Sequence, residues 1–172
     1  MTTTEYEHEL SHVVTSSGDP YVQDSSGLWY LRGYEQLLPE AKAEICNGIG
    51  AATGITKYFP NTIYLLDCRE AGNRHDYSYY RGGDANDRRY ADMYFLLNLC
   101  TLINQGSWFL RIPRQSRARK YWLALRLGGW AHFNYQRSYA DNDSQLDRPS
   151  ALGADLDYER TKELATAICQ AN

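Results

Sequence analysis

Residues 66–106 read LDCREAGNRHDYSYYRGGDANDRRYADMYFLLNLCTLINQG, and this stretch contains the clearest helix signals of the chain. It predicts a helix over residues 66–81, which the following pair of glycines would end because glycine readily adopts the backbone conformation found after a helix. Asp84 or Asp87 would cap a second helix that runs to about residue 103. A short, glycine-rich connection favours antiparallel packing of the two helices.

Each predicted helix has one face on which a single strongly ionisable side chain stands among small, apolar or aromatic residues. This face consists of Cys68, Ala71, Gly72, His75 and Tyr79 on the first helix, and of Asp92, Phe95, Leu96, Leu99 and Ile103 on the second. A buried carboxylate without a partner costs several kcal/mol. We therefore expect His75 to contact Asp92.

The same antiparallel register brings two cysteines together. Cys68 lies seven residues before His75, and Cys100 lies eight residues after Asp92. Both offsets amount to about 11 Å along a helix. Cys68 and Cys100 should therefore be neighbours. Whether they form a disulfide depends on the compartment and on a Cα separation below about 7 Å.

A contact between histidine and aspartate has a chemical use. The carboxylate fixes the tautomer of the imidazole, whose other nitrogen can then take a proton from water. The alternative is a hydrogen bond that only stabilises the core. Asp76 follows His75 and points to another side of the helix, and residues 47–54 form a loop with three glycines. Loop carbonyls and a carboxylate are ligands that calcium prefers.

The rest of the chain indicates one helical domain with polar ends. Residues 1–27 are expected to form a polar tail, residues 28–138 the helical domain, and residues 139–172 a polar loop and a C-terminal helix over about 157–171. Within the domain, Pro39 would stand near a helix start, Pro113 would begin a turn, and a further helix would cover residues 116–127. The fold class is thus mainly α.

The composition of the chain limits the classes of protein to which it can belong. Of the 172 residues, 43% are hydrophobic and 23% charged, which is typical of a globular protein, and the net charge of −3 gives no support to a nucleic-acid binder. No segment approaches the roughly 20 apolar residues of a membrane span, and residues 1–12 lack the basic start and apolar stretch of a signal peptide. The default location is cytoplasmic, with export by another route left open.

Three segments in order carry a resemblance to a known family. They are CNGIG at 46–50, RHDYSYY at 74–80 and ADMYF at 91–95, with two glycines between the last two. Their order resembles the phospholipase A2-like superfamily, most of all its compact bacterial and viral members, over about residues 46–100. The resemblance implies two antiparallel catalytic helices, a glycine-rich calcium loop and calcium-dependent hydrolysis of the sn-2 ester of glycerophospholipids.

The resemblance also implies a role for each matching residue. His75 would be the base that activates water, Asp92 would orient it, and Tyr79 would donate a hydrogen bond to Asp92. Asp76 would bind Ca²⁺ through its carboxylate, and the carbonyls of Cys46, Gly48 and Gly50 would complete the metal site. The ion and the Gly48 N–H would stabilise the oxyanion.

A basic and aromatic segment follows the motifs. Arg114, Arg117, Arg119, Lys120 and Trp122 suit the surface of a phospholipid membrane, although a solvated helix face or an RNA-contacting helix has the same composition.

Two other functions remain open besides the enzyme. One is a non-catalytic phospholipase-like module that binds membranes or packs in a phage or viral particle. The other is a metal phosphohydrolase, which would need His132 as a further ligand. An active phospholipase would endanger its host, which makes an inhibitor or immunity protein a candidate partner.

Overall fold

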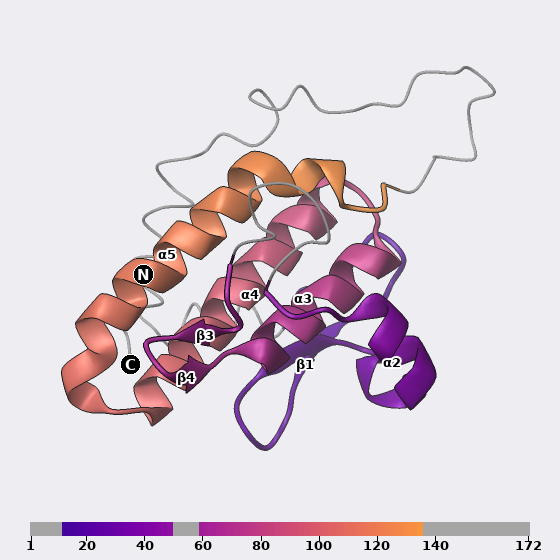
Figure 1. Ribbon diagram of the computed structural model, residues 1–172. Coiled ribbons are helices and arrows are strands. Elements are labelled where there is room, and N and C mark those ends of the chain that lie inside the picture. Colours follow the sequence, from indigo (N-terminus) through magenta and orange to yellow (C-terminus); the bar gives the residue numbers. More distant parts are fainter. Residues whose placement is uncertain (1–11, 50–58, 136–172) are drawn as a thin grey trace.

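The computed structural model describes residues 12–49 and 59–135, and this part of the chain is mainly helical (Figure 1). The longer helices are α3 (Arg69–Arg81), α4 (Ala85–Gln105) and α5 (Arg111–Gly128). The 21-residue α4 lies between α3 and α5 and packs against both. None of the helices in these two ranges is long and apolar enough to cross a membrane.

Shorter elements surround the three helices. Two antiparallel hairpins pair β1 (Tyr21–Gln23) with β2 (Trp29–Leu31) and β3 (Thr62–Ile63) with β4 (Leu66–Asp67). The helix α2 spans Pro39–Ile45, and short 3-10 turns are η1 (Tyr34–Gln36), η3 (Trp108–Leu110) and η4 (Gly129–Ala131). Pro39 is the first residue of α2, as its fixed φ predicts.

The connection between α3 and α4 follows the sequence signals closely. Gly82 and Gly83 have φ of +67° and +135°, which residues with a side chain rarely adopt. A Cβ on Gly82 would also overlap the carbonyl of Asn134. Asp84 caps α4 and forms a reciprocal capping box with Asp87, so both predicted caps take part.

Two helix starts differ from the prediction. The α3 helix begins at Arg69 rather than at residue 66, because Leu66 and Asp67 pair with β3 and the Asp67 carboxylate accepts the Arg69 N–H. The α5 helix begins at Arg111, five residues earlier than expected. Pro113 starts no separate turn, since a proline in the first helical turn lacks only an N–H that would have no intrahelical partner.

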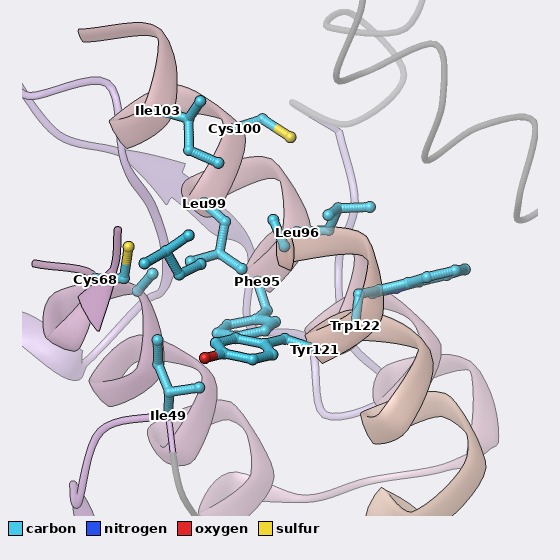
Figure 2. Close-up of a cluster of buried hydrophobic side chains, with 12 residues drawn as sticks. Ile49, Cys68, Phe95, Leu96, Leu99, Cys100, Ile103, Tyr121 and Trp122 are labelled. Atoms are coloured by element: carbon cyan, nitrogen blue, oxygen red, sulfur yellow. The ribbon is translucent and has the colours of Figure 1, made fainter. Parts of the chain in front are cut away.

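One large apolar core joins the helices (Figure 2). Ala71 of α3, Phe95 and Cys100 of α4 and Tyr121 of α5 meet in it, together with Cys68, the residue before α3. Both cysteines belong to this cluster, yet Cys68 is a free thiol, whereas Cys100 is disulfide-bonded. The disulfide between these two cysteines, which the sequence left open, is therefore not formed.

Residues 13–27 pack onto the helices, although their polar composition predicted a tail. Tyr21 is 3% exposed and stacks on Tyr94 of α4 with ring centroids 3.9 Å apart. Asn98 of α4 accepts the Trp29 N–H at 2.7 Å and donates to the Trp29 carbonyl at 2.8 Å. The folded unit thus includes the β1–β2 hairpin. The expected helix at 157–171 lies outside the described residues.

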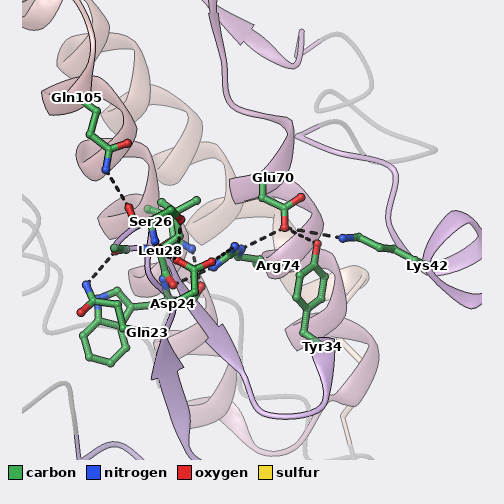
Figure 3. A network of polar contacts seen from close by, with 12 residues as sticks. Gln23, Asp24, Ser26, Leu28, Tyr34, Lys42, Glu70, Arg74 and Gln105 are labelled. Carbon is green, nitrogen blue, oxygen red and sulfur yellow. Dashed lines mark hydrogen bonds and ion pairs between the residues drawn. The ribbon is translucent and has the colours of Figure 1, made fainter. Parts of the chain in front are cut away.

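A polar network holds the same hairpin against α3 (Figure 3). Arg74 donates to the Asp24 carboxylate at 2.6 Å and to the Leu28 carbonyl at 2.8 Å, and it pairs with Glu70 one turn earlier on α3. Glu70 also accepts the hydroxyl of Tyr34 at 2.7 Å. Arg74, the residue before His75, is thereby fixed on the side of α3 that faces the hairpin.

Candidate functional site

The expected contact between α3 and α4 is present at the centre of the molecule. Nε2 of His75 lies 2.9 Å from Oδ1 of Asp92, and the two residues are 6% and 0% exposed. Asp92 stands in the second turn of α4, on the face that packs against α3. The contact that the helical spacing predicted is therefore confirmed as geometry.

Tyr79 completes the set one helical turn after His75. Its hydroxyl donates to Oδ1 of Asp92 at 2.6 Å, and its ring packs against the imidazole with centroids 4.1 Å apart. Burial, together with the neighbouring charge of Asp92, raises the pKa of Tyr79 well above its usual value. The tyrosine therefore stays protonated and acts as a permanent donor to Asp92.

Two arginines also reach Asp92, and the sequence analysis did not predict them there. Nη1 of Arg126, near the end of α5, donates to Oδ2 at 2.7 Å, and Nη1 of Arg88 lies 3.7 Å from the same oxygen. The sequence does contain a pattern that places Arg126 on the buried face of α5. Arg126 shares the spacing of four residues that places Arg114, Ala118 and Trp122 on the buried face of α5.

These partners decide the protonation state of Asp92. Burial alone would raise the pKa of this carboxyl, but the hydrogen bond from His75 and the charges of Arg126 and Arg88 lower it below its usual value. Asp92 is thus an anion that accepts the Nε2–H of His75. In the neutral imidazole with this hydrogen bond, the lone pair is on Nδ1. Nδ1 makes no hydrogen bond to the described part of the chain.

Asp76 lies against the glycine-containing loop, as a site built from both would require. Its Oδ2 accepts the N–H of Asn47 at 2.8 Å and that of Gly48 at 3.1 Å. Burial raises the pKa of Asp76 to about 6, although the charge of His75 and the two backbone hydrogen bonds oppose this shift. Burial thus disfavours the ionised form of this carboxyl, and a bound cation would favour that form.

Close packing holds the loop beside α3. Gly48 has a φ of +90°, and a Cβ on Gly72 of α3 would overlap the Gly48 backbone. The side chain of Asn61 accepts the Ile49 N–H at 2.8 Å. The loop backbone consequently passes directly over the first turn of α3.

Asp76 and the loop backbone are the groups that a cation at this place could use. Within residues 12–49 and 59–135, no group of three or more His, Cys, Asp or Glu side chains could hold a metal ion. A site here would thus use the single carboxylate of Asp76 with backbone carbonyls, which is a combination that calcium accepts. Cys46 contributes no thiolate, because burial raises its pKa to about 11 and its Sγ donates to the Asn73 carbonyl. Gly50 lies outside the described residues.

The expected membrane face on α5 is wrong in part. Arg114 and Trp122 are 5% and 5% exposed and point into the core, and Arg119 is half-buried. Arg117 and Lys120 are exposed as expected. The helix turns its apolar and small residues inward, and two of the five predicted residues lie on that inward face.

His132, the further ligand that a metal phosphohydrolase would need, is exposed in the segment after α5. It belongs to no cluster of potential metal ligands in the part of the chain that the structure describes. This geometry does not favour the phosphohydrolase.

Comparison of the chain with protein-family models, with curated proteins and with solved structures finds no match. The function therefore has to be argued from the residues and their geometry.

Proposed function

We propose that this chain is a calcium-dependent phospholipase A2-like hydrolase that cleaves the sn-2 ester of glycerophospholipids. The observation that carries the proposal is the buried set of His75, Asp92 and Tyr79, in which Nε2 of His75 faces Asp92 and Tyr79 donates to the same carboxylate oxygen. The adjacent residue of α3, Asp76, accepts two backbone N–H groups of the glycine-containing loop. The proposed base, His75, and the proposed calcium ligand, Asp76, are thus consecutive residues of α3.

The reaction would use His75 as a general base. Its Nδ1 would take a proton from water while the water oxygen attacks the carbonyl carbon of the ester. Asp92 would stabilise the resulting imidazolium through Nε2–H, and Tyr79 would hold Asp92 in place. The imidazolium would then return the proton to the departing alkoxide as the ester C–O bond breaks. The products are a fatty acid and a lysophospholipid, and no protein nucleophile is needed.

The loop and Asp76 would serve the developing negative charge. Calcium held by the Asp76 carboxylate and the carbonyls of Cys46, Gly48 and Gly50 would supply positive charge beside the ester oxygen. The Gly48 N–H donates to Asp76 in the described conformation. Once released from Asp76, it would donate to the oxyanion.

One observation favours the non-catalytic module as a second candidate. Arg126 and Arg88 already compensate the charge of Asp92, and His75 is only 6% exposed. A carboxylate that is paired with guanidinium groups can serve the core without any catalysis. Such a module would keep the fold and would bind membranes or pack in a phage or viral particle.

Release of fatty acid from mixed phospholipid vesicles separates the two candidates. The assay compares wild type with His75→Ala, each with calcium and with chelator. His132→Ala is the matched control, because it removes an exposed histidine instead. The enzyme predicts calcium-dependent release that only His75→Ala abolishes. A folded wild type that releases no fatty acid from any lipid would refute hydrolysis, and activity lost in His132→Ala would favour the phosphohydrolase.

A further inference from the structure

Three large apolar side chains are exposed together where α4 passes into α5. Trp108 is 80% exposed, Phe109 65% and Ile112 80%, and the two aromatic rings meet edge to face. Ile112 lies in the first turn of α5, two residues after the end of η3. Grouped exposed apolar side chains of this size mark a binding surface more often than scattered ones do.

The β3–β4 hairpin presents two more. Its two-residue turn consists of Tyr64 and Leu65, which are 51% and 95% exposed. Both have positive φ, +46° and +67°, as in the type I′ turn, where Asn-Gly is strongly preferred and bulky residues are disfavoured. A strained turn that keeps a tyrosine and a leucine in solvent indicates that these side chains serve a function.

Arg114 contacts both the β3–β4 hairpin and the connection between α4 and α5. Its Nη2 donates to the Tyr64 carbonyl at 2.8 Å, and its Nη1 lies 2.8 Å from the position of a Cβ on Gly106. Gly106 ends α4, directly before the exposed aromatic residues. One buried guanidinium therefore lies between the hairpin and the α4–α5 connection. We call Tyr64, Leu65, Trp108, Phe109 and Ile112 the apolar tip.

Among the described residues, exposed cations lie near the apolar tip. Residues 93–140 contain no Asp or Glu, and Arg117 and Lys120 are exposed on α5. Lys120 follows Ile112 by eight residues and thus continues the same helix face. The hairpin also carries an exposed carboxylate, that of Asp67, which accepts the Arg69 N–H at the start of α3. The surface accordingly combines apolar side chains with exposed cations.

We propose that the apolar tip inserts into the surface of an anionic lipid bilayer. Aromatic and aliphatic side chains enter the boundary between head groups and acyl chains, and neighbouring Lys and Arg residues are attracted to anionic lipids. A second copy of the chain is a poorer occupant. A symmetric dimer through this surface would bring the same cations of both copies together.

This surface is separate from the candidate catalytic residues. Asp92 and the end of α4 at Gln105 are thirteen residues apart, which corresponds to about 20 Å of helix. The apolar tip would therefore anchor the chain without forming the entrance to His75. Membrane binding goes beyond the proposed hydrolysis, since a chain without hydrolytic activity would bind in the same way.

A double variant of the hairpin turn tests the proposal without risk to folding. Tyr64→Asn with Leu65→Gly installs the preferred type I′ pair, so the thermal midpoint should stay equal or rise. Binding to vesicles of phosphatidylglycerol and phosphatidylcholine, measured by co-sedimentation in chelator, should weaken at least about tenfold. Leu38→Ser is the matched control, because it removes an exposed leucine from the residue before α2.

The outcomes are distinct. Wild type and Leu38→Ser should bind anionic vesicles and bind vesicles of phosphatidylcholine alone much less. Equal binding by the hairpin variant would overturn the proposal, and so would a wild type that binds neither vesicle. A concentration-dependent dimer that the hairpin variant abolishes, without vesicle binding, would assign the surface to a second copy instead. The chelator and the absence of an activity readout keep these results independent of hydrolysis.

Discussion

Replacing Asp76 with asparagine should stabilise the chain in the absence of calcium. Burial raises the pKa of this carboxyl from 3.8 to about 6. The folded state thus binds the proton more tightly than the unfolded state does. The destabilising contribution of the ionised carboxylate is absent below pH 3.8, grows as the pH rises to about 6, and is complete above it. The difference corresponds to about 3 kcal/mol.

Asparagine removes the charge and keeps an oxygen that can accept the N–H groups of Asn47 and Gly48. We therefore expect Asp76→Asn to raise the free energy of unfolding by about 1–3 kcal/mol at about pH 8 in chelator, and to change it little near pH 4. Urea unfolding at both pH values measures this difference. Glu44→Gln removes the same charge from an exposed position and should change the stability at neither pH.

Calcium gives the second half of the test. An ion that binds only the folded state stabilises it by mass action. Excess calcium should therefore raise the unfolding midpoint of wild type and of Glu44→Gln, and leave that of Asp76→Asn unchanged. A variant that is less stable than wild type in chelator at about pH 8 would refute the claim that ionisation of the partly buried Asp76 destabilises the fold. Equal stabilisation of both proteins by calcium would refute the assignment of Asp76 as a ligand.

Two further substitutions test the packing of the site by urea unfolding. Asp92→Asn would leave the buried guanidinium of Arg126 without an anion, and we expect a loss of about 3–5 kcal/mol. No loss would show that the buried charges do not depend on Asp92. Gly72→Ala would push a Cβ into the Gly48 backbone, and we expect a loss of about 1–3 kcal/mol and a weaker response to calcium. Gly128→Ala is its control, because a Cβ there meets nothing within 4 Å.

The sequence was most informative where local rules govern the chain. Glycines at 82 and 83 and the Asp84 cap are recognisable without a structure, because their effects act within one turn of a helix. Helical spacing then oriented α3 against α4 closely enough to predict the contact between His75 and Asp92. The two helices that carry the candidate site were therefore predictable almost in full.

The N-terminal hairpin was not predictable from such rules. Residues 13–27 are polar in composition, and strands of three residues carry little periodicity. Their place is set by contacts with residues about 70 positions away, such as Tyr21 on Tyr94 and Trp29 on Asn98. The local secondary-structure propensity of a residue does not include contacts with residues so far away in the sequence.

The surroundings of Asp92 show what a simple pairing rule omits. From the sequence we expect the buried carboxylate of Asp92 to need one partner, and His75 on the facing helix meets that need. An imidazole, however, is neutral whenever it acts as a base, so it cannot permanently compensate a buried anion. A buried anion therefore also needs a side chain that is always positively charged, and Arg126 on the inward face of α5 is that side chain. Asp92 can then hold His75 through a hydrogen bond while the imidazole stays free to accept a proton.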